Sequence, residues 1–197
     1  MSIIDKALGA ITPPESEEKR AEATQKARAA AGQDDWLALA LDHHDQIRQA
    51  FEAGRRAADP GSRIAAMKKL ALVLNGHSLA EEVVLYPALA KAGEKAHAGM
   101  AYTEQTTAKM QMAELERIDP STPDWADKLE HIRGAVLHHI FEEEGTWVLE
   151  IQKQDDDQAF LSQRFRVEYE RYVGREGEAS GLSERRSFQE GGTSALL

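Results

Sequence analysis

The feature that most constrains the fold is a spacing that occurs twice, His-x-x-x-Glu, at His77/Glu81 and at His139/Glu143. In a helix, residues four apart lie on the same face, about 6 Å from each other along the axis. Both pairs fall on stripes whose other members are apolar, so we expect them to be buried. An ionised carboxylate buried without a partner is strongly destabilising, and imidazole with carboxylate is a ligand set that suits iron, zinc or manganese. The spacing therefore predicts a metal centre inside a helical bundle.

Composition narrows the class of protein further. The chain has 197 residues, enough for one domain with tails, and its many Ala, Leu and Glu residues favour helices. It contains no cysteine, which excludes disulfides, thiolate zinc sites, iron–sulfur clusters and cysteine nucleophiles. The formal net charge of −10 argues against a nucleic-acid surface. Because we find no signal peptide and no apolar run of about 20 residues, we expect a soluble, cytoplasmic protein that does not enter a membrane.

Turn and capping signals predict an all-α fold, an antiparallel up-and-down four-helix bundle at residues 34–153 with extra N- and C-terminal helices. Proline and glycine at 59–61, at 93 and at 119–123 separate the four bundle helices. The predicted helices span residues 34–57, 62–92, 94–118 and 123–154, the second with a local interruption at Pro87.

The two flanks of the bundle are predicted separately. Residues 1–33 form an N-terminal arm that is partly helical, and residues 154–174 form an accessory amphipathic helix. Residues 175–197 are rich in glycine, serine and charge, which favours disorder. The terminal helices can dock on a partner protein or on a second copy of the chain, or the accessory helix can simply pack on its own bundle.

Each bundle helix carries polar residues near the middle of its apolar stripe. In chain order these residues are His44, then His77 with Glu81, then Gln105, then His139 with Glu143. His44 precedes His77 by 33 residues and Gln105 precedes His139 by 34, so the chain consists of two similar helical hairpins. Two hairpins packed face to face bring these polar side chains to one level of the bundle.

Two pairs of adjacent histidines have to be distinguished. His43 precedes His44 and His138 precedes His139, but neighbouring helical residues point about 100° apart. The stripes select His44 and His139, and they leave His43 and His138 at the surface or beside a ligand. A shift in register of the first helix would instead select His43. Glu144 is expected on a flanking face, where it can hydrogen-bond to a ligand histidine.

The third helix holds two weaker candidates. His97 shares the stripe of Gln105 but precedes it by eight residues, about 12 Å along the axis. It reaches the centre only if the helix breaks near Gly99. Glu104 approaches the centre if the helix is rotated. The alternative to a metal is a core of hydrogen-bonded His–Glu pairs, which buries two charges with no evident gain.

Three segments of the chain resemble one known family. Residues 42–47 (DHHDQI), 77–87 (HSLAEEVVLYP) and 138–144 (HHIFEEE) are similar to the hemerythrin-like, or HHE cation-binding, domains. The resemblance extends over residues 34–153 and implies four antiparallel helices around a non-haem di-iron centre. The metal ligands that it implies are His44, His77, Glu81, His139 and Glu143.

The chain departs from the family pattern at Gln105, where the family usually has a ligand histidine. An amide offers only a neutral oxygen, which is a poorer ligand for iron than imidazole. One metal ion would then be weakly held, or under-coordinated and open to water or substrate. A mononuclear site is an alternative to the two iron ions, as is a site for zinc or manganese.

The resemblance implies a protein that binds or senses a small oxidant such as O2, peroxide or NO, in a stress response or in iron homeostasis. The first alternative is a di-iron oxidase or peroxide-consuming enzyme whose substrate enters beside Gln105. We find no separate acid–base pair, organic-cofactor motif or phosphate-binding glycine loop in support of an enzyme. The second alternative is a metal-responsive regulatory or interaction protein that acts through its terminal helices.

Overall fold

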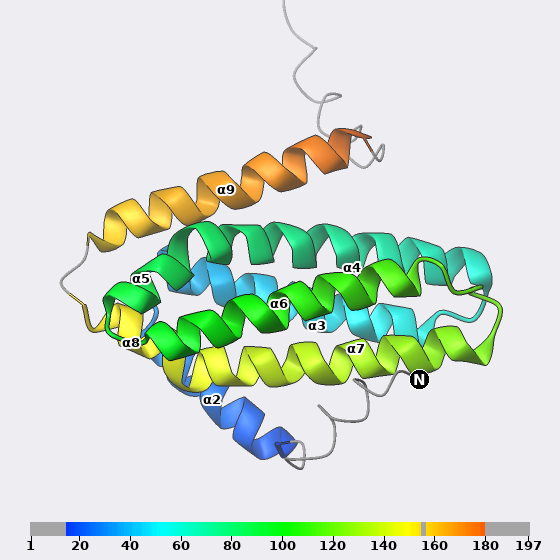
Figure 1. The fold of residues 1–197 in the computed structure, drawn as a ribbon, viewed down its shortest axis with the longest axis horizontal. Helices are drawn as coiled ribbons and strands as arrows, with labels where there is room; N and C mark the ends of the chain where they lie inside the picture. The colour runs from blue at the N-terminus through cyan, green and yellow to red at the C-terminus, as the bar shows by residue number, and fades with distance from the viewer. Residues whose placement is uncertain (1–14, 155–156, 180–197) are drawn as a thin grey trace, which may run out of the picture.

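The computed structural model describes residues 15–154 and 157–179, and every regular element within them is a helix (Figure 1). Four long helices form the antiparallel up-and-down bundle, which confirms the predicted fold class. They are α3 (Trp36–Arg56), α4 (Pro60–Ala80), α6 (Lys95–Leu115) and α7 (Pro123–Glu142). None of the described helices combines the length and the apolar character needed to cross a membrane.

Local capping determines where these helices start. At α3, the side chain of Asp35 accepts a hydrogen bond from the backbone N–H of Ala38 at 2.8 Å. At α4, Asp59 and Ser62 form a reciprocal capping box, and Pro60 is the first helical residue. Proline fits this position because the first N–H groups of a helix have no intrahelical partner. All four bundle helices begin within two residues of their predicted starts.

The second and fourth bundle helices each contain a π turn, which the sequence did not predict. The first continues from α4 as η1 (Glu81–Leu85) and α5 (Tyr86–Lys91), and the second from α7 as η2 (Glu143–Trp147) and α8 (Val148–Gln152). The uninterrupted α-helix predicted for 123–154 is therefore wrong, and the interruption predicted at Pro87 begins earlier, at Glu81. A π turn brings residues five apart onto one face, and such turns are frequent at functional sites.

The core consists of two apolar clusters with a polar layer between them. One cluster includes Leu41 and Trp147, and the other includes Ile47 and Leu74. Each bundle helix runs from one apolar cluster to the other. Between the two clusters it carries the polar residues that the sequence pattern placed on its inward face. The residues of the polar layer are His44, His77, Glu81, Gln105, His139 and Glu143.

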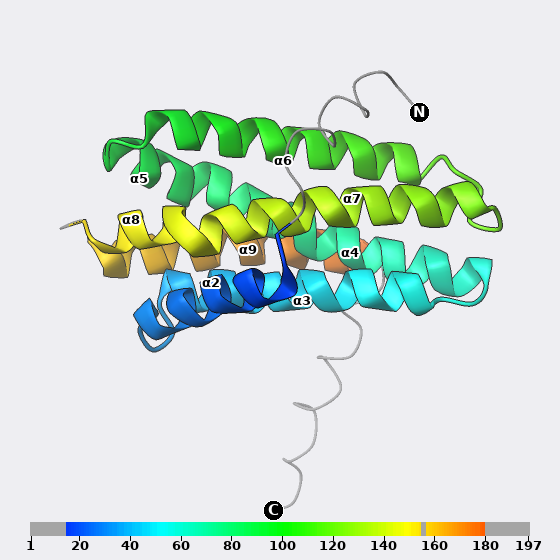
Figure 2. The same cartoon turned by 90° about the horizontal axis from the view of Figure 1, so that it is seen from below.

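The C-terminal helix α9 (Gln158–Ala179) packs on α3 and α4 of its own chain (Figures 1 and 2). Gln158 accepts a hydrogen bond from Nε1 of Trp36 at 2.7 Å, and Phe165 is fully buried. Gly76 on α4 permits this close approach, because a Cβ there would lie 2.9 Å from Cγ2 of Val173. The accessory helix therefore packs on its own bundle, which is one of the alternatives predicted for it.

The limits of the C-terminal flank differ from the prediction. Helix α9 starts at Gln158 and continues through residues 175–179, so the disorder predicted from residue 175 is wrong for these residues. A single glycine costs about 1 kcal/mol inside a helix, which is too little for Gly174 to end it. At the other flank, α2 (Glu17–Ala30) packs beside α3, η2 and α8. Residues 1–14 and 180–197 lie outside the described part of the chain.

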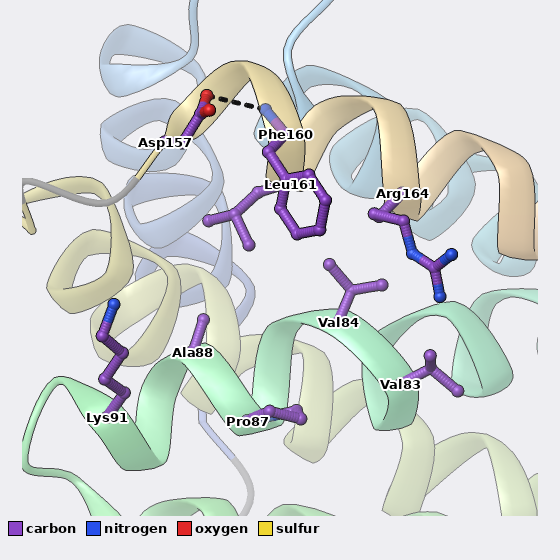
Figure 3. Close-up of a pocket in the computed structure, with 9 residues that line it drawn as sticks. All are labelled: Val83, Val84, Pro87, Ala88, Lys91, Asp157, Phe160, Leu161 and Arg164. Carbon is purple, nitrogen blue, oxygen red and sulfur yellow. Dashed lines mark hydrogen bonds between the residues drawn. The ribbon is translucent and has the colours of Figure 1, made fainter.

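The first turn of α9 carries an exposed aromatic side chain. Phe160 is 56% exposed, and together with Val83 and Pro87 it lines an open hollow of about 470 Å³ (Figure 3). Asp157 caps the helix there by accepting a hydrogen bond from the backbone N–H of Phe160 at 2.9 Å. The helix therefore presents one exposed phenylalanine and, at Phe165, one fully buried phenylalanine.

This pair of phenylalanines tests the packing of α9. We expect Phe165→Ala to lower the free energy of unfolding by about 3–5 kcal/mol, because it leaves a cavity against α3 and α4. The matched control Phe160→Ala should change it by less than about 0.5 kcal/mol. Urea unfolding followed by circular dichroism measures both. Equal effects of the two substitutions would show that α9 does not pack on the bundle in this way.

Candidate metal centre

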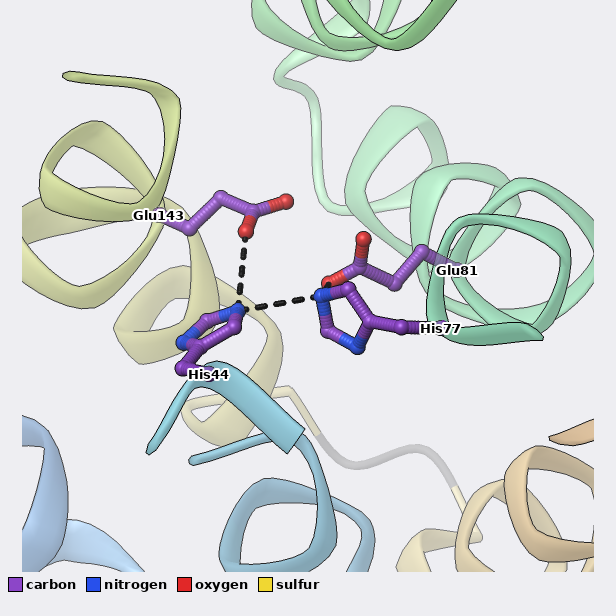
Figure 4. Close-up of side chains that lie close together, drawn as sticks. All are labelled: His44, His77, Glu81 and Glu143. Carbon is purple, nitrogen blue, oxygen red and sulfur yellow. Dashed lines mark hydrogen bonds and ion pairs between the residues drawn. The ribbon is translucent and has the colours of Figure 1, made fainter. Parts of the chain in front are cut away.

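Four side chains converge in the polar layer of the bundle (Figure 4). His44 comes from α3, His77 from α4, Glu81 from the start of η1 and Glu143 from the start of η2. One possible ligand atom from each lies within 4.8 Å of the corresponding atoms of the other three. All four residues are buried, with at most 2% of the surface of each residue exposed.

Two imidazole nitrogens face each other at the middle of this cluster. Nε2 of His44 lies 3.1 Å from Nε2 of His77 and 3.3 Å from Oε2 of Glu143. Nε2 of His77 lies 3.2 Å from Oε1 of Glu81. Two imidazole nitrogens and two carboxylate oxygens thus surround one small buried volume, a donor set that fits a divalent first-row transition metal.

The second oxygen of each carboxylate points to the other half of the site. Oε1 of Glu143 lies 3.2 Å from Nε2 of His139 and accepts a hydrogen bond from the Tyr86 hydroxyl at 3.0 Å. Oε2 of Glu81 accepts hydrogen bonds from Tyr86, at 3.3 Å, and from the amide of Gln105. The Tyr86 hydroxyl is also 3.1 Å from Nε2 of His139. Each carboxylate therefore spans two neighbouring groups of ligand atoms.

The charges of these groups are strongly coupled because they share a buried volume. Burial, together with the charge of Glu143, raises the pKa of Glu81 well above its usual value. Burial alone would also raise the pKa of Glu143, but its contacts with His139 and His44 lower it well below its usual value. Burial lowers the pKa of His77, with a further contribution from the charge of His44. A cation bound here must displace the protons of these groups, because metal ligands bind in their deprotonated form.

A second set of contacts fixes the orientation of His44. Nδ1 of His44 lies 2.9 Å from Oε1 of Glu144, whose carboxylate also accepts hydrogen bonds from Arg48 and from Thr24 of α2. Burial by itself lowers the pKa of His44, but its contacts with Glu143 and Glu144 raise it to about 9. Glu144 lies beside the converging cluster, as predicted, and its side chain is fully buried because α2 packs on η2. Its predicted role as a hydrogen-bond partner of a candidate ligand agrees with the structure.

Sequence and fold comparisons point to one family. The family model described as the hemerythrin HHE cation binding domain matches residues 37–149. The chain belongs to this family. A crystal structure of a hemerythrin HHE cation binding domain-containing protein from Mycobacterium kansasii covers 77% of this chain and 94% of its own, with a TM-score of 0.65. At 22% sequence identity, this second match is a likeness of fold alone.

A curated relative of this hemerythrin HHE domain is a DNA nickase from Nostoc sp., 26% identical over 103 residues. The match covers 52% of this chain but 29% of the relative. The chain thus spans less than a third of that protein's length.

The other candidates that the sequence offered lie around this site of the HHE domain. Glu104 contacts the ligand candidate His139 directly, with Oε2 at 2.8 Å from Nδ1. His43 is buried between the site and α9: its ring stacks on Tyr169 of α9 with centroids 3.7 Å apart, and its centroid lies 5.6 Å from that of His77. Burial lowers the pKa of His43 to about 3, with smaller contributions from the neighbouring imidazoles. Because it lies outside the converging cluster, the shift in register that would select it is not seen.

Two further histidines lie away from the converging ligands. His138 is 43% exposed at its side chain and pairs with Glu15, with Nδ1 2.7 Å from Oε1. His97 is 42% exposed, pairs with Glu94 and stacks on Trp147. Helix α6 continues through Gly99, so the break that His97 would need in order to reach the centre is not present.

Tyr86 is the residue of the site that sequence reasoning missed. It follows Glu81 by five residues, which in an α-helix would turn it away from the carboxylate. The π turn at η1 brings residues five apart onto one face, and Tyr86 thereby comes to lie between Glu81, Glu143 and His139. A π turn could not be read from the sequence, although Pro87 indicated irregular geometry nearby.

The contact between Glu144 and His44 can be tested by metal titration. We expect Glu144→Ala to weaken binding of Zn²⁺ by about 10- to 100-fold, the usual effect of removing the residue that orients a ligand imidazole. The control Glu142→Ala changes a half-buried neighbour outside the converging cluster and should leave affinity unchanged. Calorimetric titration of folded, metal-free protein measures both affinities. If the two variants bind equally well, Glu144 does not position His44 for a metal.

Proposed function

We propose that this HHE domain is a non-haem iron protein that holds two iron ions and binds or senses a small oxidant such as O2, peroxide or NO. The observation that carries the proposal is the placement of Glu81 and Glu143. Each presents one oxygen to the side of His44 and His77 and its other oxygen to the side of His139 and Tyr86. A carboxylate arranged in this way can bridge two cations.

The candidate ligands would be distributed between the two iron ions. His44 and His77 would hold one iron ion and His139 the other, with Glu81 and Glu143 shared between them. Iron held by imidazole and carboxylate supplies reversible one-electron chemistry and an exchangeable position for a small ligand. Gln105 would leave the side of His139 with fewer strong ligands, which favours exchange there. Zinc and manganese are the alternative ions for the same donor set.

The surroundings of the centre favour controlled access. Ile47 and Leu74 lie on one side of the polar layer, and Trp147 lies on the other, with its ring 5.6 Å from that of His139. An apolar surrounding of this kind limits the ligands that reach the metal. We also propose that the protein acts in the cytoplasm, in a stress response or in iron homeostasis.

Iron loading tests this proposal. Protein loaded with Fe²⁺ without air should retain two iron ions per chain and develop near-ultraviolet absorption when exposed to O2, peroxide or NO. His77→Ala should lose at least one ion and most of the absorption change. The control His131→Ala, at an exposed position on α7, should behave as the wild type. Iron that is not retained, or that shows no optical response to any of these oxidants, would refute the proposal.

A second candidate function is a di-iron oxidase or peroxide-consuming enzyme. The observation that favours it is a cavity that extends from the surface to His77, Gln105 and His139, so a substrate can approach the centre. Steady-state consumption of peroxide or O2 by the iron-loaded protein would support turnover, provided that His77→Ala abolishes it. Binding of the oxidant without turnover would support a carrier or sensor instead.

The departure at Gln105 offers an independent test. Gln105→His should tighten iron binding by about tenfold or more, because it restores an imidazole to the polar layer. The control Gln25→His places the same change on an exposed position of α2 and should have no effect. Metal analysis after dialysis against a chelator of graded strength compares the variants. An unchanged iron content in Gln105→His would show that residue 105 does not face the metal.

A further inference from the structure

A cavity of about 490 Å³ lies between α6 and α7, which are side by side in Figure 2. Its inner end is lined by His77, Gln105 and His139, three residues of the polar layer. Ile47 and Leu74 line it from α3 and α4. The cavity therefore connects the centre of the bundle with the surface through a largely apolar space.

The cavity is much larger than a small oxidant requires. A water molecule takes a share of about 30 Å³ in the liquid, and an apolar cavity of about 150 Å³ is enough to bind benzene. Pockets for organic ligands commonly measure about 300–1,000 Å³ and combine apolar walls with a few polar groups. Size and lining thus fit an organic molecule better than O2, peroxide or NO alone.

The side-chain oxygen of Gln105, in the wall of the cavity, lacks a hydrogen-bond donor among the described residues. Gln105 is 3% exposed, and its Nε2 donates a hydrogen bond to Glu81. Its Oε1 has no hydrogen-bond partner among the described residues. A buried acceptor left without a donor is destabilising, so a ligand that carries an O–H or N–H group would satisfy it.

The charged groups of the cavity disfavour an anionic ligand. Glu15, Glu104 and Glu130 contribute carboxylates to its lining, and among the lining residues Arg20 is the single lysine or arginine. The guanidinium of Arg20 is already paired with Glu15, with Nη2 3.4 Å from Oε2. A carboxylate or phosphate on the ligand would face these acidic groups. Another cationic candidate in the lining, the imidazole of His139, is already paired with Glu104 and Glu143.

We propose that this cavity binds a neutral organic molecule of roughly 10–15 non-hydrogen atoms, apolar apart from one O–H or N–H donor that reaches Gln105. The donor end would then lie beside His77 and His139, next to the candidate metal centre. The inference goes beyond the proposed function, because it concerns an organic ligand in the cavity and not the oxidant bound at the metal.

Three fluorescent probes of one size test the proposal with the full-length protein. They are 1-naphthol, which is a neutral donor, 1-methoxynaphthalene, which lacks the donor, and 1-naphthoate, which is an anion. We expect saturable 1:1 binding of 1-naphthol, with 1-methoxynaphthalene about three- to tenfold weaker, as the loss of one hydrogen bond implies. The anion 1-naphthoate should bind at least about tenfold more weakly than 1-naphthol.

Two substitutions locate the bound probe. Ala108→Leu fills the cavity from α6 and should weaken 1-naphthol binding by about tenfold or more. The control Ala113→Leu makes the same change at an exposed position of α6 outside the cavity and should leave binding unchanged. If Ala108→Leu does not fold, Ala135→Leu makes the equivalent change from α7 at an exposed lining position.

A third substitution tests the role of the free acceptor. Gln105→Leu should abolish the preference for 1-naphthol over 1-methoxynaphthalene while the latter still binds. The absence of saturable binding in the wild type, binding unchanged when the cavity is filled, or tighter binding of 1-naphthoate would each overturn the proposal. Iron content measured on the same samples, loaded and metal-free, separates this outcome from a failure of the proposed iron centre.

Discussion

The structure depends on the burial of two carboxylates, Glu81 and Glu143, in a polar layer between the two apolar clusters of the core. A carboxylate in such surroundings needs a proton, an imidazolium or a metal ion beside it. Three imidazoles from three different helices provide the partners, at 3.2–3.3 Å. The pairs His77–Glu81 and His139–Glu143 each lie within one continuous helix, whereas His44 contacts Glu143 from another helix. The bundle has to hold these helices in register for the contact between them to form.

The two π turns allow each carboxylate to serve both halves of the site. Both turns begin at the acidic residue of a His-x-x-x-Glu pair, at Glu81 and at Glu143. The wider turn alters the register of the helix after the glutamate. At the start of α5 this brings the Tyr86 hydroxyl within hydrogen-bond distance of Glu143. Among the described helices, the π turns thus start at the two glutamates that each contact both halves of the site.

The terminal helices reinforce the layer from outside the family's common core. Thr24 on α2 bonds to Glu144, which in turn contacts His44. Tyr169 on α9 covers His43, the residue next to His44. The matched family segment, residues 37–149, contains neither helix. In this chain α2 and α9 therefore help to position the candidate ligands. A change in the packing of either helix would alter the contacts that Glu144 and His43 make.

Much of the fold was predictable from local pattern. Proline and capping signals at Asp35, Asp59 and Pro123 marked the helix starts, since they act over only a few residues. The apolar stripes placed His44, His77 and His139 inward for the same reason, because helical periodicity is local. The end of α9 was missed, because composition after Gly174 suggested a break that one glycine does not cause.

What the sequence by itself determined is the bundle, its family and the residues that point into its polar layer, because helix formation and amphipathic spacing are local properties. Only the tertiary structure decided which second partners these residues have. Tyr86 enters the site through a π turn, Glu144 is buried by contacts from α2 and α3, and His43 is covered by α9. These contacts join residues from separate helices, and no spacing along one helix encodes the angle or register at which another helix packs against it.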